Sequence, residues 1–390
     1  MRDKRALPIL FLIMFLVMVG FGIIIPVLPF FAEEIGATPT QLGLLMAVYS
    51  FMQFLFAPMW GRISDRIGRK PVMLIGIAGL ALSFFLFAMS TELWMLFGAR
   101  IIGGFLSSAN MPTSMAYVAD ITTSEDRGKG MGIIGAAVGL GFIFGPAIGG
   151  VFSEISLNMP FWIAGAVSSL TFFVVLFILE ESLPTDKRAQ SIAKKDTPWQ
   201  TVKQPLGFLY FLSFFISFSL AGLEATFAYF AAARAGLDSK SLGYIFMIMG
   251  FAGAAVQGGL VGRFIKKHGE GKVIKAGIVV SVIGFCLLLL TKDFITAAFF
   301  LTIFGLGNGV IRPSVSSLLT KTNAEGYGGV TGMLSSFDSL GRILGPPIAG
   351  ALYSVAIGLP YIAGAIISVG AFMLYQVYER VVKNEIVTSR

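Results

Sequence analysis

The sequence predicts an all-α membrane protein with twelve transmembrane helices in two pseudo-symmetric six-helix halves. Of its 390 residues, 56% are hydrophobic and only 13% are charged, a ratio that suits lipid-facing helices better than a soluble domain. The hydrophobic residues fall into long runs, and a glycine-rich pattern in one run recurs in the second half of the chain. Helices are expected because lipid offers no hydrogen-bond partner to an unpaired backbone, and because the runs lack the alternation of barrel strands.

Each of the twelve runs holds roughly 18–25 residues, enough to cross a hydrocarbon core of about 30 Å. In chain order, the predicted helices cover residues 7–30, 41–60, 71–90, 93–117, 130–152, 159–179, 206–232, 241–261, 273–291, 295–318, 330–354 and 358–378. The first six form an N-terminal half, 1–180, and the last six a C-terminal half, 205–390. The polar segment 181–204 is predicted to be a cytoplasmic linker that tethers the halves.

The basic residues gather on one side of this topology. Most of the 29 Lys and Arg residues fall in segments that are cytoplasmic when the N-terminus is inside, above all 61–70, 187–203 and 263–275. Basic loops favour the cytoplasmic side, so we expect a multi-pass protein of the cell membrane with both termini in the cytoplasm. The net charge of +8 then reflects topology, and no nucleic-acid partner is expected.

The side chains that enzymes and metal sites need are scarce. The chain has one cysteine, Cys286, and one histidine, His268, so no disulfide, thiolate metal site or histidine-based catalytic group can be assembled. The G-x4-G-K-[ST] loop of nucleotide-binding proteins is missing as well. We therefore expect no enzyme, no metal and no cofactor, and an energy source such as an ion gradient.

The repeated pattern reads G-x8-G-x3-G-P-x2-[GA]-G. Its first copy starts at Gly132 and its second at Gly332, and duplicated halves of this kind are typical of transporters. The residues of the first copy are Gly132, Gly141, Gly145, Pro146, Gly149 and Gly150, and all but Gly149, which becomes Ala349, are identical in the second.

The spacing of this motif has a physical meaning. Gly141, Gly145 and Gly149 lie four residues apart and share one helix face, so a neighbouring helix can approach closely. Pro146 removes a backbone hydrogen bond and should bend the helix. We expect a tightly packed, flexible interface between the halves; glycine packing without motion is the alternative.

A second repeat supports the duplication. The segment GRISDRIGRK starts at Gly61, and GRFIKKHGEGK starts at Gly262. Glycines and an arginine match between them, but Lys266 replaces Asp65 in the second copy. Both halves also have a proline at the corresponding place, Pro112 in the first and Pro313 in the second.

These motifs resemble those of the major facilitator superfamily. The 61–70 loop is similar to its G-x3-D-[RK]-x-G-[RK]-[RK] loop, and the helix 130–152 carries a pattern like its antiporter motif. The stretches GFGIIIPVLPFF and GLEATFAYF resemble the twelve-helix drug:proton antiporters of the bacterial multidrug and tetracycline efflux type. The resemblance covers the whole chain. It implies a protein of the bacterial plasma membrane that exports amphipathic, often cationic drugs in exchange for protons. A monomer suffices because both halves contribute to a single cavity, and a dimer is the alternative.

The resemblance also assigns a conformational latch to the first loop. It implies that Asp65 faces the cytoplasmic start of the helix 330–354, where the helix dipole favours a carboxylate. Arg66 or Arg69 would pair with Asp120, and together these contacts would hold the cytoplasmic side shut in the outward-open state. Glycines Gly61 and Gly68 complete the latch.

Five charged residues stand out within the predicted helices: Arg100, Glu224, Arg312, Asp338 and Arg342. A charge near a helix centre costs about 2.5–3.5 kcal/mol on insertion scales, so each is expected to face a cavity or a partner. Glu224 has no cation near it in sequence and suits a proton carrier or a contact to a cationic substrate.

The partners of the other four leave alternatives open. Asp338 and Arg342 are four residues apart and can pair with each other, either as a structural ion pair or for proton coupling. Arg312 needs an acid, either Glu224 or Asp338. Arg100 matches an R-x3-G pattern to which the resemblance gives a role in proton transfer; a structural charge is the alternative.

A facilitator of a sugar or other small metabolite is the rival function. It predicts polar residues clustered in helices one, four, seven and ten, whereas 7–30 and 206–232 are mostly apolar and aromatic. The chain's 37 Phe and 17 Met residues instead suit an adaptable drug pocket.

Overall fold

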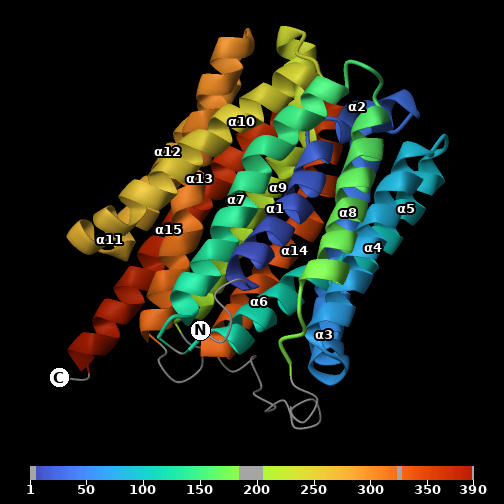
Figure 1. Cartoon of the computed structure of the whole chain (residues 1–390). Coiled ribbons are helices and arrows are strands. Elements are labelled where there is room, and N and C mark those ends of the chain that lie inside the picture. Colours follow the sequence, from blue (N-terminus) through green and yellow to red (C-terminus); the bar gives the residue numbers. More distant parts are fainter. Residues whose placement is uncertain (1–5, 124, 184–204, 323–326, 389–390) are drawn as a thin grey trace. The chain divides into compact units, whose positions relative to one another are not determined.

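The computed structural model describes residues 6–123, 125–183, 205–322 and 327–388 (Figure 1). Nearly all of these residues are helical, and no strand occurs among them. The predicted all-α class is therefore confirmed. Most of the predicted linker, residues 184–204, lies outside the described residues.

Eight helices precede the linker and seven follow it in the described part of the chain. The first eight are α1 (Ala6–Ile24), α2 (Leu28–Glu34), α3 (Pro39–Ile67), α4 (Arg69–Ala88), α5 (Leu93–Ser107), α6 (Asn110–Ile121), α7 (Arg127–Phe152) and α8 (Met159–Ile178). The later ones are α9 (Gly207–Ala235), α10 (Ser239–Val256), α11 (Gly262–His268), α12 (Glu270–Leu288), α13 (Phe294–Thr322), α14 (Tyr327–Val355) and α15 (Leu359–Thr388). A π-helical turn, η3 (Gln257–Val261), joins α10 to α11.

Each of the twelve predicted runs is largely helical, although a turn at residues 25–27 interrupts the first run between α1 and α2. By length and composition, ten helical segments of the described residues qualify as membrane spans. The run 93–117 does not qualify because it is divided into α5 and α6, which have 15 and 12 residues. The helix α14 has 29 residues but includes Asp338, Arg342 and many small polar residues, which lower its hydropathy.

The break between α5 and α6 follows from Pro112. Proline lacks an N–H and clashes with the preceding turn, so the helix restarts around it. The carbonyl of Phe105 instead accepts hydrogen bonds from Ser108 Oγ at 2.7 Å and from Trp60 Nε1 at 2.8 Å. These donors satisfy a backbone group that would otherwise be unpaired in an apolar environment. By contrast, α13 continues through Pro313.

Contacts divide the chain into two compact units. Unit 1 comprises Met1–Ala37, Val48–Ala193 and Asp238–Met247, and unit 2 comprises Thr38–Ala47, Lys194–Leu237 and Ile248–Arg390. The start of α3 thus belongs to unit 2, and the start of α10 to unit 1. The boundaries predicted at residues 180 and 205 stay a prediction.

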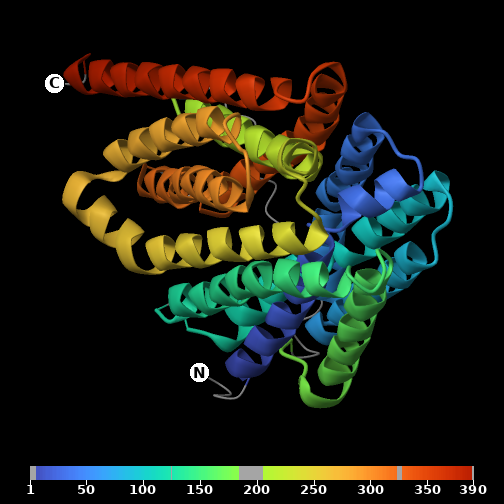
Figure 2. The same ribbon diagram turned by 90° about the horizontal axis from the view of Figure 1, so that it is seen from above.

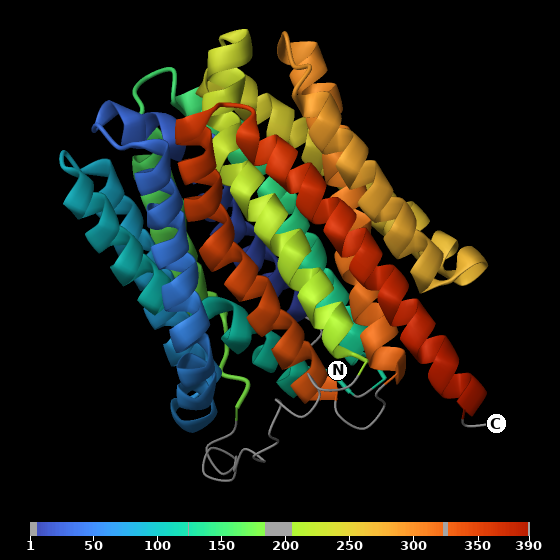
Figure 3. The same cartoon turned by 180° about the vertical axis from the view of Figure 1, so that it is seen from behind.

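Corresponding helices pack alike inside the two units. In unit 1, α1 lies along α7; in unit 2, α9 lies along α14, as Figure 3 shows. The core of unit 2 is formed by α9, α12, α13, α14 and α15, with large buried residues such as Tyr210, Ile278, Leu319 and Tyr375. This packing fixes the helices that carry four of the five predicted intramembrane charges.

Candidate functional site

Asp338 of α14 is the most enclosed of the intramembrane carboxylates. Its side chain is 7% exposed. Oδ1 accepts hydrogen bonds from the hydroxyls of Ser213 and Ser217 on α9, the second at 2.9 Å. Oδ2 lies 2.9 Å from Arg312 Nη2 on α13. One carboxylate thereby joins three helices of unit 2, and two hydroxyls and a guanidinium compensate its burial.

Glu224 of α9 has a looser partner. Its Oε2 lies 4.0 Å from Nη1 of Arg342 on α14, at the outer limit of an ion pair. The Arg342 side chain is 47% exposed, whereas that of Glu224 is 28% exposed. This contact leaves both groups able to take another partner without first breaking a short hydrogen bond.

These contacts show that the predicted pair of Asp338 with Arg342 does not form, and they identify the partner of Arg312. Asp338 and Arg342 each have a different partner, although they stand four residues apart on α14. The serines draw Asp338 between α9 and α13, while Arg342 reaches Glu224. The alternative that paired Arg312 with Asp338 is confirmed.

A polar cavity of about 310 Å³ in unit 2 is lined by three of these charged residues, Arg312, Asp338 and Arg342, but not by Glu224. Its polar lining comes from α9, η3, α13 and α14, and consists of Ser213, Ser217, Gln257, Asn308, Arg312, Asp338 and Arg342. Its volume lies at the lower end of the roughly 300–1,000 Å³ typical of ligand pockets. The cavity can hold water or part of a small molecule against a carboxylate that a proton would neutralise.

Arg100 of α5 lies in unit 1 and has different surroundings. Its guanidinium carbon is 5.1 Å from the ring centres of both Tyr49 and Phe87, a cation–π arrangement. Tyr49 in turn hydrogen-bonds to Ser107 at 2.9 Å and accepts from Gln53 at 3.1 Å. Four of the five predicted charges therefore form two pairs in unit 2, whereas Arg100 is stabilised by aromatic rings.

Sequence reasoning missed Ser213 and Ser217 as partners of Asp338. Their four-residue spacing in an apolar helix places two hydroxyls on one face and could have identified them. Tyr49 and Phe87 were missed too, and their distance from Arg100 in sequence gave no signal.

The predicted latch is organised by Arg69 at the start of α4. Its guanidinium contacts Asp65 Oδ1 at 2.5 Å and Asp120 Oδ2 at 2.9 Å, and donates to Ser64 Oγ at 2.8 Å. Arg69, and not the exposed Arg66, is thus the partner of Asp120. The predicted contact of Asp65 with the start of α14 stays a prediction.

The turn between α3 and α4 requires glycine. Gly68 has φ of 112°, which side chains with a Cβ rarely adopt, and Gly269 has φ of 81° in the second copy. Gly61 is less constrained, since among the described residues an added Cβ would meet only Pro112, at 3.9 Å.

Glu181, which was assigned to the linker, belongs to the same cluster. The backbone N–H groups of Arg69 and Lys70 donate to its Oε1 and Oε2 at 2.9 and 3.1 Å. A carboxylate at this helix N-terminus satisfies two unpaired donors and opposes the helix dipole. Ser182 also donates to Asp120 Oδ2, at 3.0 Å. The end of the first half is thereby fixed to the latch.

The second half has the same bridge with its charges exchanged. Glu270, which stands where Arg69 stands in the first copy, pairs with Lys321, which stands where Asp120 stands. Ser317 also donates to Glu270, at 3.0 Å. This pair was not predicted from the sequence, because neither Glu270 nor Lys321 keeps the charge of its counterpart.

The glycine face of α7 packs against α1. An added Cβ at Gly145 would lie 2.7 Å from Gly22 Cα and 2.8 Å from Val19 O, and Gly149 faces the backbone of Ile23. Gly141 likewise faces the backbone of α1. The predicted interface between halves is therefore wrong for these glycines, because α1 belongs to the same unit.

The remaining motif positions differ. Gly150 approaches Ser239 O and Lys240 Cα, at 2.9 and 3.0 Å from an added Cβ, at the start of α10. An added Cβ at Gly132 meets nothing within 4 Å among the described residues. The second copy repeats the close approach: Gly341 and Gly345 face the backbone of α9 at Phe214 and Phe218.

Comparison with known proteins decides the family. The model described as Major Facilitator Superfamily matches residues 10–322 and 258–387. The chain belongs to the major facilitator superfamily.

Curated members of the superfamily are similar over nearly the whole chain. Multidrug resistance protein 2 of Bacillus subtilis (strain 168) is 32% identical over 385 residues, which cover 95% of this chain and 94% of that protein. Quinolone resistance protein NorA of Staphylococcus aureus (strain COL) is 29% identical over 363 residues, 92% of each chain. Membership and the ten apolar segments together show a multi-pass membrane protein.

Solved structures show the same fold. The human organic anion transporter MFSD10 has a TM-score of 0.69 at 27% identity, covering 95% of this chain and 99% of that one. The nucleoside transporter NupG has a TM-score of 0.79 at 15% identity, covering 96% and 98%. At that identity the second likeness concerns the fold alone.

Proposed function

We propose that this superfamily member exports amphipathic, often cationic drugs from the cytoplasm in exchange for protons, by alternating access. The names of its relatives from Bacillus subtilis and Staphylococcus aureus support drug efflux. The observation that carries the proposal is two carboxylate–arginine pairs on α9, α13 and α14, of which Asp338, Arg312 and Arg342 line a polar cavity. Such charges are rare inside membranes and mark ion or substrate pathways.

Each carboxylate can exist in two states with different partners. When Asp338 or Glu224 is ionised, it attracts an arginine or a cationic substrate; when it is protonated, that attraction is lost. A proton and a cationic drug therefore compete for the same group. The longer Glu224–Arg342 contact makes Glu224 the first candidate for the exchanging carboxylate, and Asp338 the second.

The membrane potential would drive the exchange. A proton moving inward gains about 2.3 kcal/mol per 100 mV, and a pH gradient adds to this. The Arg69 cluster would complete the cycle by holding the cytoplasmic side shut in one state, through Asp65 and Asp120.

A flux assay in inside-out vesicles tests this function. Acidifying the lumen should drive accumulation of a cationic dye such as ethidium, and a protonophore should abolish it. Vesicles without the protein are the control. Uptake of a nucleoside or sugar in place of the dye would instead support the metabolite facilitator, for which the distant likeness to NupG gives no argument beyond the fold.

A further inference from the structure

A second, very different cavity lies in unit 2 and shares no lining residue with the polar cavity. It is a groove of about 560 Å³ between η3–α11 and the helices α12 and α13. Figure 2 shows α10, η3 and α11 (yellow) on a curved course that bends round to meet α12 (orange). Gln257 donates to Gly309 O at 3.2 Å and ties η3 to α13 where the groove begins.

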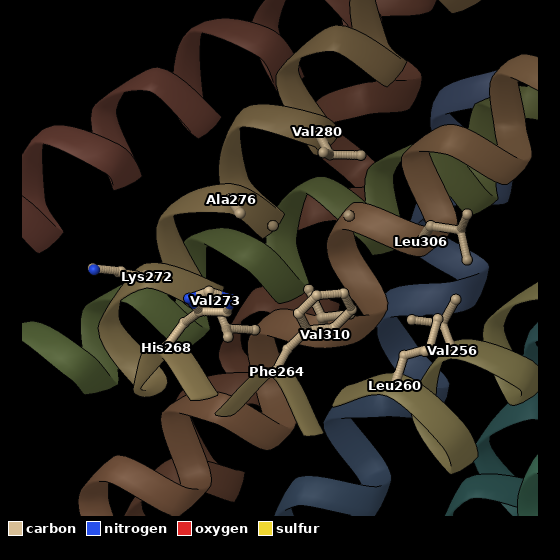
Figure 4. Close-up of a pocket in the computed structure, with 12 residues that line it drawn as sticks. Val256, Leu260, Phe264, His268, Lys272, Val273, Ala276, Val280, Leu306 and Val310 are labelled. Carbon is tan, nitrogen blue, oxygen red and sulfur yellow. The ribbon is translucent and has the colours of Figure 1, made fainter. Parts of the chain in front are cut away.

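The walls of this groove are hydrocarbon along most of its length. Figure 4 shows Val256, Leu260 and Leu306 at one end and Phe264, Val273 and Val310 further along. These side chains offer no hydrogen bonds, so a ligand with polar groups along its length would leave them unsatisfied at a free-energy cost. An unbranched apolar chain suits such a wall.

The other end of the groove carries positive charge. His268 and Lys272 lie at this end in Figure 4, and Lys272 is exposed. The adjoining helix α11 adds the exposed residues Arg263, Lys266 and Lys267. Basic pockets between transmembrane helices are typical sites for the head groups of anionic lipids.

Phe264 and Leu260 are 46% and 42% exposed, so the groove is open along its side. An open apolar groove in a membrane protein is accessible to lipid, and its basic end lies in the loop that is predicted to be cytoplasmic. We propose that it binds one anionic phospholipid, with an acyl chain along Phe264 and Val310 and the phosphate at Lys272 and His268. Binding of this lipid requires neither drug transport nor proton exchange.

Native mass spectrometry of the purified full-length protein tests the site. Dioleoyl phosphatidylglycerol should bind at least tenfold more tightly than dioleoyl phosphatidylcholine. Ala276→Trp places a bulky ring into the groove from an exposed position, and should weaken phosphatidylglycerol binding at least tenfold. Lys272→Gln should do the same by removing the head-group contact.

Each test variant has a matched control, in which the same substitution is made at a residue that does not line the groove. Val279→Trp adds the same ring on α12 at a residue that is 44% exposed and does not line the groove. Lys292→Gln removes an exposed charge between α12 and α13, outside the lining and away from the basic end. Both should bind phosphatidylglycerol as the parent does.

Four outcomes would overturn the proposal. Equal binding of the two phospholipids would contradict recognition of an anionic head group. Unchanged binding of phosphatidylglycerol in Ala276→Trp or Lys272→Gln would contradict binding in this groove. Tighter binding of oleate than of phosphatidylglycerol would point to a free fatty acid. Displacement of the lipid by ethidium would instead assign the groove to a drug.

Discussion

Replacing Gly145 by alanine should force α1 and α7 apart. The added Cβ would lie 2.7 Å from Gly22 Cα and 2.8 Å from Val19 O, whereas carbon atoms prefer about 3.5–4.0 Å. The helices must therefore separate by about 1 Å along a backbone-to-backbone contact that no side-chain rotation relieves. Overpacking of this kind costs about 1–3 kcal/mol.

Gly139→Ala on the same helix is the matched comparison. An added Cβ there meets nothing within 4 Å among the described residues. Alanine is favoured over glycine by about 1 kcal/mol in a helix interior, and this gain applies to both variants. The difference between them isolates the overpacking, so Gly145→Ala should be less stable than Gly139→Ala by about 1–3 kcal/mol.

The measurement is unfolding of the purified protein in micelles with increasing SDS, followed by tryptophan fluorescence. Gly145→Ala should unfold at a lower SDS fraction than the parent, and Gly139→Ala at an equal or higher one. Dye efflux should fall only in the first variant. Identical unfolding curves for the two variants would refute the close approach of α1 and α7.

The remaining predictions concern the charged groups. Glu224→Gln should abolish dye accumulation driven by a pH gradient and the release of protons when drug is added; persistent proton release would move the carrier to Asp338. Asp338→Asn should leave two serine hydroxyls and an arginine without their anion, and weaken uphill transport at unchanged expression, which a flux assay checks. Asp65→Asn should leave the protein in the membrane but cripple efflux; parental transport at equal expression would contradict the latch. Glu270→Lys should destabilise the protein, and adding Lys321→Glu should restore its stability. The double-mutant cycle should give a coupling energy of about 0.5–3 kcal/mol between the two residues. Additive stability losses would contradict their pairing.

The fold class was accessible from the sequence because lipid imposes a simple rule. A run such as 159–179 must form a helix, whatever it packs against, because its backbone N–H and C=O groups find no other hydrogen-bond partners in lipid. The duplication was equally accessible, because two copies of one glycine pattern need no structure to be compared. The break near Pro112 could not be predicted from the sequence, because Pro313 stands at the corresponding place of the second half in an unbroken helix.

The sequence by itself determined which residues carry charge or permit close approach: Asp338, Arg342 and Gly145 stand out in apolar helices. Only the tertiary structure decided their partners. Spacing on α14 allowed Asp338 to pair with Arg342, but Ser213 and Ser217 on another helix hold Asp338 near Arg312 instead. Likewise, a glycine face permits an approach without naming the helix, and packing selected α1. Partner choice depends on contacts between distant segments, and local spacing does not encode which segments meet.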